Sequence, residues 1–106
     1  MVTKTAVIKE VKSFAKELRS SGITLRKVIL FGSYAKNTQH EFSDIDLALA
    51  ADEFTGVGFI DIKLFVKILK NFINIQPRTY STEDFYTGDP FIEEIKKTGI
   101  EIEIEI

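Results

Sequence analysis

The chain opens with apolar residues spaced as on one face of a helix. We predict a helix over residues 5–20, ended by Gly22. Its apolar positions are Val7, Ile8, Val11, Phe14, Ala15 and Leu18. The following residues, 24–31, are β-rich and end in a continuous apolar run, so we expect a strand after this helix.

The middle of the chain predicts two further strands and a helix between them. Residues 43–50 are typical of a strand, and residues 72–76 predict a short strand that Pro77 stops, because proline cannot donate to a sheet ladder. Between the two strands, residues 59–70 predict a helix. Its expected core contacts are Ile60, Leu64, Val66, Ile68 and Leu69.

The last quarter of the chain predicts a turn, a helix and a strand. Residues 81–85 are typical of a turn, and residues 90–98 predict a short helix with Pro90 in its first turn. Residues 100–106 alternate isoleucine and glutamate, the period of a strand. Its aligned glutamates favour a terminal edge strand that discourages pairing with other chains, rather than a metal site.

The order of these segments predicts the fold class. The predicted order is helix, strand, strand, helix, strand, helix and strand. This order indicates an α/β or α+β fold, with a sheet of about four strands flanked by helices. At 106 residues without an internal repeat, residues 1–106 fit one domain.

Composition narrows the classes of partner. The net charge of −2 makes a nucleic-acid partner unlikely unless a local basic patch exists, and it gives no pull toward anionic membranes. No apolar run reaches the roughly 18 residues of a membrane span. The chain has no cysteine and no apolar leader, so we expect a cytoplasmic protein.

A glycine and a serine lie where the first strand ends. Gly32 permits a tight turn and close approach of a ligand to the backbone. We predict a short helix over residues 33–36 with Ser33 as its N-cap, whose free N–H groups would suit a phosphate. Taken alone, a plain strand-turn-helix junction is the more common interpretation of such a pair.

Two aspartates lie in the next predicted strand. Asp44 and Asp46 would point to the same face with Cα atoms about 6.6 Å apart, a spacing from which carboxylates can ligate Mg²⁺. Ala48 and Ala50 would leave room beside them. The alternative is an amphipathic strand with a solvated acidic face, although aspartate is a poor strand former. Ile45, Leu47 and Leu49 would lie on the opposite face, in the core.

Together these segments resemble the nucleotidyltransferase superfamily of DNA polymerase β type. The closer resemblance is to its minimal nucleotidyltransferases, which are paired with helical HEPN toxins. It rests on Phe31-Gly32-Ser33-Tyr34-Ala35-Lys36 and Ser43-Asp44-Ile45-Asp46-Leu47, and it extends over almost the whole chain. The resemblance implies a mixed sheet flanked by helices, with Gly32 and Ser33 on the nucleotide phosphates and Asp44 and Asp46 on Mg²⁺.

The resemblance also implies an activity and a partner. The chain would move a nucleoside monophosphate, AMP from ATP, to a hydroxyl group on a partner such as a HEPN toxin. From their positions in the chain, Lys36 near the glycine turn and Arg78 after the amide-bearing strand are candidates for a phosphate contact, although a solvated surface charge is the more common interpretation of either. A hydrolase using Ser33 and His40 is a remote alternative.

The third carboxylate of catalytic members has no evident counterpart. The matching strand carries Asn74 and Gln76 on one face, and their amide oxygens can ligate Mg²⁺ but cannot take a proton from a hydroxyl. Asp61 or Asp84 could substitute if the fold brought either beside Asp44.

Three functions therefore stay open at the level of sequence. The first is the Mg²⁺-dependent nucleotidyltransferase, and the second is an antitoxin-type module that binds and neutralises a HEPN partner with little catalysis. A transferase acting on tRNA or antibiotics is a weaker third candidate, because no acceptor-binding domain is evident. The sequence leaves the oligomeric state open, including a homo-oligomer.

Overall fold

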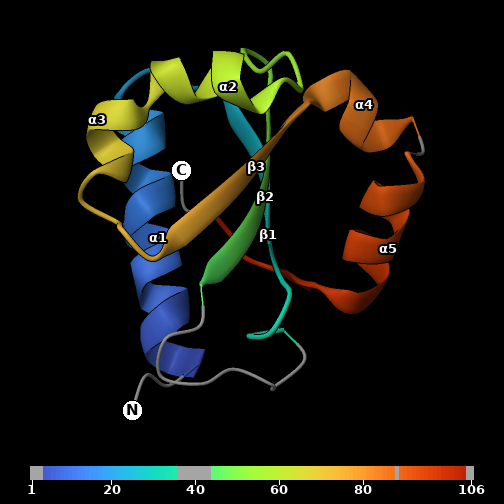
Figure 1. Cartoon of the computed structure of the whole chain (residues 1–106), viewed down its shortest axis with the longest axis horizontal. Helices are drawn as coiled ribbons and strands as arrows, with labels where there is room; N and C mark the ends of the chain where they lie inside the picture. The colour runs from blue at the N-terminus through green and yellow to red at the C-terminus, as the bar shows by residue number, and fades with distance from the viewer. Residues whose placement is uncertain (1–3, 36–43, 88, 105–106) are drawn as a thin grey trace.

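The computed structural model describes residues 4–35, 44–87 and 89–104, and it contains a four-stranded mixed sheet (Figure 1). The strand order is β3-β2-β1-β4, with β1 antiparallel to β2 and β4, and β2 parallel to β3. The strands are β1 (Leu25–Phe31), β2 (Ile45–Ala51), β3 (Ile75–Ser81) and β4 (Ile100–Glu101). The prediction of an α/β fold with about four strands is confirmed.

Helices cover both faces of the sheet (Figure 1). The helix α1 (Lys4–Ser20) matches the predicted one, and α5 (Pro90–Thr98) begins with its proline as expected, capped by the Asp89 carboxylate. A further helix, α4 (Thr82–Tyr86), replaces the turn expected at residues 81–85, because the Ser81 hydroxyl caps it by accepting from the Asp84 N–H. In the described parts of the chain, no helix is long and apolar enough to cross a bilayer.

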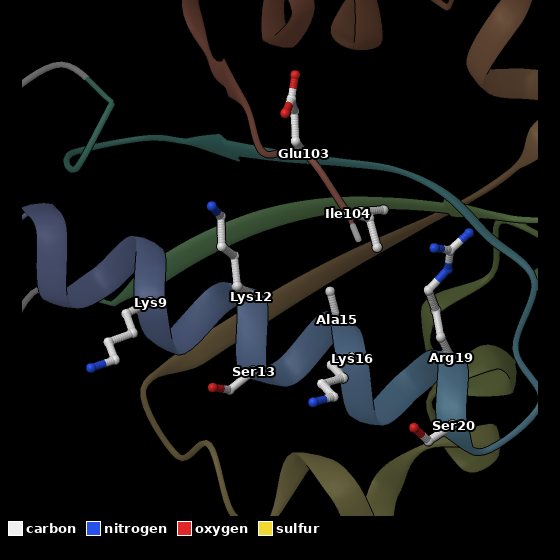
Figure 2. Close-up of a pocket in the computed structure, with 9 residues that line it drawn as sticks. All are labelled: Lys9, Lys12, Ser13, Ala15, Lys16, Arg19, Ser20, Glu103 and Ile104. Atoms are coloured by element: carbon white, nitrogen blue, oxygen red, sulfur yellow. The ribbon is translucent and has the colours of Figure 1, made fainter. Parts of the chain in front are cut away.

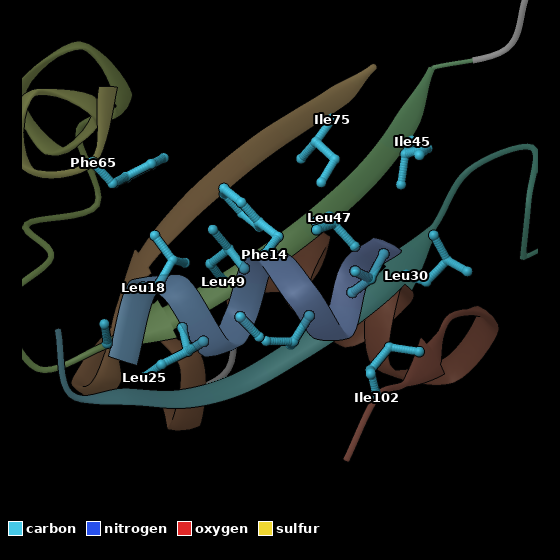
Figure 3. Close-up of a cluster of buried hydrophobic side chains, with 14 of the residues drawn as sticks. Phe14, Leu18, Leu25, Leu30, Ile45, Leu47, Leu49, Phe65, Ile75 and Ile102 are labelled. Atoms are coloured by element: carbon cyan, nitrogen blue, oxygen red, sulfur yellow. The ribbon is translucent and has the colours of Figure 1, made fainter. Parts of the chain in front are cut away.

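Strand alternation divides the buried side chains of β2 between two cores. Ile45, Leu47 and Leu49 pack with α1 in the larger core, as predicted (Figure 3). Ala48 and Ala50 do not leave open space beside the aspartates, and that expectation is wrong. They are fully buried in a second core, where the larger side chains of α4 and α5 fill the space above them: Phe85, Ile92 and Ile95.

The helix predicted over residues 59–70 is broken into three short pieces. These are α2 (Gly58–Asp61), a 3-10 turn η1 (Ile62–Leu64) and α3 (Val66–Leu69). The break lies at Phe65, whose backbone leaves the helical region so that its ring can pack against Phe14 and Phe54. Three expected core residues are consequently exposed, namely Ile60, Leu64 and Val66, whereas Ile68 and Leu69 do pack against the core.

The last two strands differ from their predicted bounds. β3 starts at Ile75 and continues through Pro77, which is tolerated because β3 lies at the edge of the sheet formed by the described residues. β4 is limited to Ile100–Glu101, although the tail continues along β1 and the Ile102 N–H donates to the Val28 carbonyl at 2.8 Å. β4 is an edge strand, as the sequence predicted.

Candidate functional site

The sheet register brings the predicted site residues to one end of the strands. Phe31, the last residue of β1, lies opposite Asp46, and Asp46 lies opposite Gln76 of β3. Gly32 follows Phe31 directly, so the glycine turn, the aspartates and the amide of Gln76 meet at this end of the sheet. The structure therefore unites elements that are more than forty residues apart in the sequence, from Gly32 to Gln76.

Gly32 is required there both by its backbone conformation and by the space around it. Its φ of +75° lies in the left-handed region, which side chains disfavour. A Cβ atom on Gly32 would collide with the Asp46 carboxylate. The turn and the carboxylate are therefore packed directly against each other.

The short helix expected after Gly32 is not formed in the described residues. Residues 32–35 adopt a turn, and Lys36 lies outside the described residues together with residues 37–43. Phosphate binding by Gly32 and Ser33 would use the backbone N–H groups of this turn.

Asp44 and Asp46 differ in their surroundings. Asp44 is exposed and precedes β2, so the expectation that both aspartates lie within the strand is wrong for Asp44. Asp46 is the second residue of β2 and is half-buried. Burial raises the pKa of Asp46, and the nearby charge of Asp44 raises it further. Within the described residues, no hydrogen bond or ion pair reaches the Asp46 carboxylate.

This arrangement fits a divalent cation. Mg²⁺ takes carboxylate oxygens as ligands, and a cation between Asp44 and Asp46 would relieve the repulsion that raises the pKa of Asp46. The oxygens of Asp46 are not engaged by other described residues and are available as ligands. The donor set is therefore chemically suitable, with two carboxylates and the neighbouring amides.

The two amides occupy different positions. Gln76 is exposed beside Asp46, whereas Asn74 precedes β3 and its backbone carbonyl accepts from the Ile45 N–H at 2.8 Å. Among the described residues, no third carboxylate or histidine joins Asp44 and Asp46 in a cluster. The position beside Asp46 thus carries a neutral side chain.

Neither Asp61 nor Asp84 substitutes for the third carboxylate. Asp61 is bonded to Thr79, which is three residues along β3 from Gln76, or about 10 Å by the rise of a strand. Asp84 follows the far end of β3 and is further away. The alternative that either aspartate completes the cluster is wrong, because both lie toward the opposite end of the sheet.

A cation and two aromatic rings also lie on this face of the sheet. Arg78 is two residues after Gln76 in β3, and its guanidinium lies 4.2 Å from the centre of the Phe91 ring. Phe91 makes an edge contact with Phe31, at 6.2 Å between ring centres. From the sequence, the two-residue period of a strand could have predicted that Arg78 shares a face with Gln76. The contact with Phe91 could not have been predicted, because Phe91 comes from α5 and no local pattern indicates it.

A separate basic groove runs beside α1 (Figure 2). It has a volume of about 620 Å³ and lies between α1 and the segment after β4, with Glu103 and Ile104 on its far side. Its basic side chains are Lys9, Lys12, Lys16 and Arg19. None of the candidate site residues that the structure describes lines this groove, so it is separate from the end of the strands where Gly32, Asp44 and Asp46 lie.

Comparison with known proteins supports the fold and its class. The profile of the nucleotidyltransferase domain family matches residues 8–106. The fold is similar to that of a toxin-antitoxin protein solved with AMP-PNP, with 22% identity, a TM-score of 0.60, and coverage of 89% of this chain and 73% of that one. It is also similar to a putative nucleotidyltransferase from Sulfolobus solfataricus, with 19% identity, a TM-score of 0.62, and coverage of 92% and 80%. No curated protein gives a significant match.

Proposed function

This chain belongs to the nucleotidyltransferase domain family, and from that premise we propose that it transfers AMP from ATP to a hydroxyl group on a partner protein such as a HEPN-type toxin. The observation that carries the proposal is the packing of the Gly32 turn against the carboxylate of Asp46, to which no described residue donates a hydrogen bond. A backbone turn suited to phosphate and a carboxylate suited to metal thus lie in direct contact.

The chain's own residues would bind and orient the nucleotide. Gly32 and Ser33 would hold the β- and γ-phosphates through backbone N–H groups and the Ser33 hydroxyl, with Lys36 as a further phosphate contact. Asp44 and Asp46 would hold Mg²⁺, with an amide oxygen of Gln76 or Asn74 as a further ligand, and the bound ion would polarise the phosphoryl oxygens.

Arg78 would bind negative charge on the face of the sheet that carries Asp46 and Gln76. Its stacking on Phe91 limits the positions of the guanidinium. It lies two residues from Gln76, so we assign it to the negative charge of the departing pyrophosphate.

The comparisons support both the nucleotide and the partner. The similar toxin-antitoxin protein was solved with AMP-PNP, an analogue of ATP. A shared fold makes the same class of ligand and a protein partner reasonable for this chain.

A second function is favoured by one observation, the neutral Gln76 beside Asp46. An amide cannot accept the proton of an attacking hydroxyl, so the chain would bind a nucleotide and a partner but turn over slowly. In that case it acts as an antitoxin-type module that neutralises its partner by binding.

Label transfer separates the two functions. The chain is incubated with ATP labelled at the α-phosphate, Mg²⁺ and the purified product of a neighbouring HEPN-type gene. Transfer of label to the partner that is lost in Asp46→Asn supports the enzyme. Asp84→Asn is the matched control, because it neutralises an exposed carboxylate at the far end of β3. Tight binding without transfer, unchanged in Asp46→Asn, supports the binding module and contradicts the enzyme.

A further inference from the structure

The basic groove beside α1 carries its cations as one stripe along the helix (Figure 2). The four basic side chains that line the groove follow one another at intervals of three, four and three residues: Lys9, Lys12, Lys16 and Arg19. This spacing keeps them on one side of α1 over a length of about 15 Å. The acidic residues Glu10 and Glu17 project about a third of a turn away from the centre of the stripe. The stripe is therefore basic along its whole length.

The positive charge in the groove is not neutralised by acids nearby. Lys9, Lys12 and Lys16 are exposed, and none of them forms an ion pair with a described residue. Among the described residues that line the groove, Glu103 is the one acid, and it lies on the far side (Figure 2). The net charge of the whole chain is −2, so the groove concentrates positive charge locally. It supplies the basic patch that a nucleic-acid partner requires.

The lining of the groove favours a phosphodiester backbone over a protein surface. Six of its nine lining residues donate hydrogen bonds suited to phosphate, namely the four cations together with Ser13 and Ser20. The apolar part of the lining is limited to Ala15 and Ile104, whereas protein–protein interfaces have an apolar core. The groove therefore offers phosphate contacts and little apolar surface for a partner helix.

Shape and charge disfavour the other occupants. A groove between a helix and an extended segment is concave, so it fits a rod better than a flat lipid surface. A second copy docked along the edge of β4 would bring its own Glu101 and Glu103 against the same two residues, and like charges on facing strands repel. No aromatic ring lines the groove among the described residues, which disfavours a single strand with stacked bases.

We propose that the basic groove binds the backbone of double-stranded RNA, with the α1 stripe along successive phosphates of one strand. A duplex strand carries one phosphate per about 3.4 Å, so the stripe spans about four phosphates with four cations. Glu103 favours RNA over DNA, because a carboxylate can accept a hydrogen bond from a 2′-hydroxyl and finds no such donor on a DNA backbone. The groove is separate from the end of the strands where Asp46 lies, so this binding does not depend on the proposed function.

Duplex binding tests the groove directly. Fluorescence anisotropy compares a labelled RNA duplex of about 16 base pairs, a DNA duplex of the same sequence and one RNA strand alone. We expect the RNA duplex to bind most tightly. The logarithm of its binding constant should fall with the logarithm of the salt concentration with a slope of about −3 to −4, because up to four phosphates release their counterions.

A charge-matched pair of variants localises the binding. The double variant Lys12→Gln, Lys16→Gln should weaken RNA binding by about tenfold and reduce the salt slope by about two, while glutamine preserves the helix. The control Lys63→Gln, Lys97→Gln removes the same charge at exposed lysines that do not line the groove, and it should bind like the wild type. Glu103→Gln should narrow the preference for RNA over DNA.

Five outcomes would overturn the proposal. They are no binding of the RNA duplex at low salt, equal losses in the two double variants, DNA binding as tight as RNA binding, a dimer in sedimentation that Lys12→Gln, Lys16→Gln dissociates, and binding to phosphatidylglycerol vesicles that exceeds binding to RNA. The last two would assign the groove to a second copy or to a lipid surface. Asp46→Asn should keep RNA binding, so loss of label transfer in that variant tests the proposed function separately.

Discussion

Asp46 in β2 and Asp61 in α2 are two carboxylates with opposite chemical environments. Each lies beside a glycine with a left-handed backbone, Gly32 (φ +75°) for Asp46 and Gly56 (φ +91°) for Asp61. Asp61 is only 1% exposed, and its oxygens accept from four donors: the Thr55 N–H and hydroxyl, the Gly56 N–H and the Thr79 hydroxyl. Asp46 is half-buried, and no described residue donates to it.

The pKa shifts of the two carboxyl groups have opposite signs. Burial raises the pKa of Asp61, but the hydrogen bonds from Thr55, Thr79 and Gly56 outweigh it and lower the pKa overall. The pKa of Asp46 is raised by burial and by Asp44 without such compensation. A carboxylate with all its donors supplied stabilises the fold, whereas one without donors is left for a ligand. We therefore infer that Asp61 stabilises the fold, and we propose that Asp46 binds a ligand.

The largest expected effect is on stability, in Asp61→Asn. The amide leaves some of the four donors without an acceptor, so we expect the free energy of unfolding to fall by about 3 kcal/mol in urea titrations. If that variant does not fold, Thr79→Val removes one bond and should cost about 1–2 kcal/mol. Asp84→Asn serves as the control and should stay within about 0.5 kcal/mol of the wild type. An unchanged Asp61→Asn would contradict the structural assignment.

The pH dependence sharpens the same contrast. The pKa of Asp61 in the folded chain lies below its ordinary value of 3.8, so the unfolded chain binds more protons at acidic pH. The stabilisation that ionised Asp61 gives the fold is therefore present above pH 3.8 and is lost as the pH falls from there through the lower, folded-state pKa. The stability gap between wild type and Asp61→Asn should be full at neutral pH and shrink below about pH 4. Urea midpoints at stepped pH values measure it, and a gap that widens in acid would reverse the sign we derive.

The two glycines test whether the neighbouring carboxylates differ in role. Gly32→Ala and Gly56→Ala should each cost about 1–2 kcal/mol, because both add a side chain to a left-handed backbone. Only at Gly32 would the new Cβ collide with a carboxylate, since the one contact at Gly56 is the Asp84 carboxylate oxygen, at 3.3 Å. We expect Gly32→Ala alone to weaken Mg²⁺-dependent ATP binding in calorimetry. Equal losses in both variants would argue against a site at Gly32.

The smallest effect is expected for Gln76→Glu. This variant places a third carboxylate beside Asp46, where it can accept a proton and ligate metal. We expect a few-fold faster transfer of label from ATP, because Gln76 is exposed and the geometry is not otherwise changed. Gln76→Ala is the control, and it should not accelerate transfer. A slower Gln76→Glu would show that the amide itself is used.

The candidate site could be predicted where its signal is local. Gly32 and the pair Asp44 and Asp46 belong to short patterns whose chemistry is visible in the residues themselves. The sequence could not show that Asp44 precedes the strand, since strand ends depend on pairing with β1 and β3. Nor could it show that Phe91 from α5 would reach Arg78, because that contact joins distant segments.

The fold was predictable where periodicity dominates and failed where tertiary contacts override it. The helix α1 has one apolar face and forms as expected. In residues 59–70 the apolar pattern also predicts one helix, but the backbone leaves the helical region at Phe65, whose ring packs against Phe14 and Phe54. Pro77 was misread as a strand end because an edge position, which tolerates proline, is not evident from local sequence.

The most direct test of the account is ATP binding by Asp46→Asn, measured by calorimetry with and without Mg²⁺. We expect the wild type to bind more tightly with Mg²⁺ and the variant to lose that gain, about tenfold or more in affinity, while its urea midpoint does not fall. Equal Mg²⁺-dependent affinity in both proteins would contradict the assignment of Asp46 to a metal and nucleotide site.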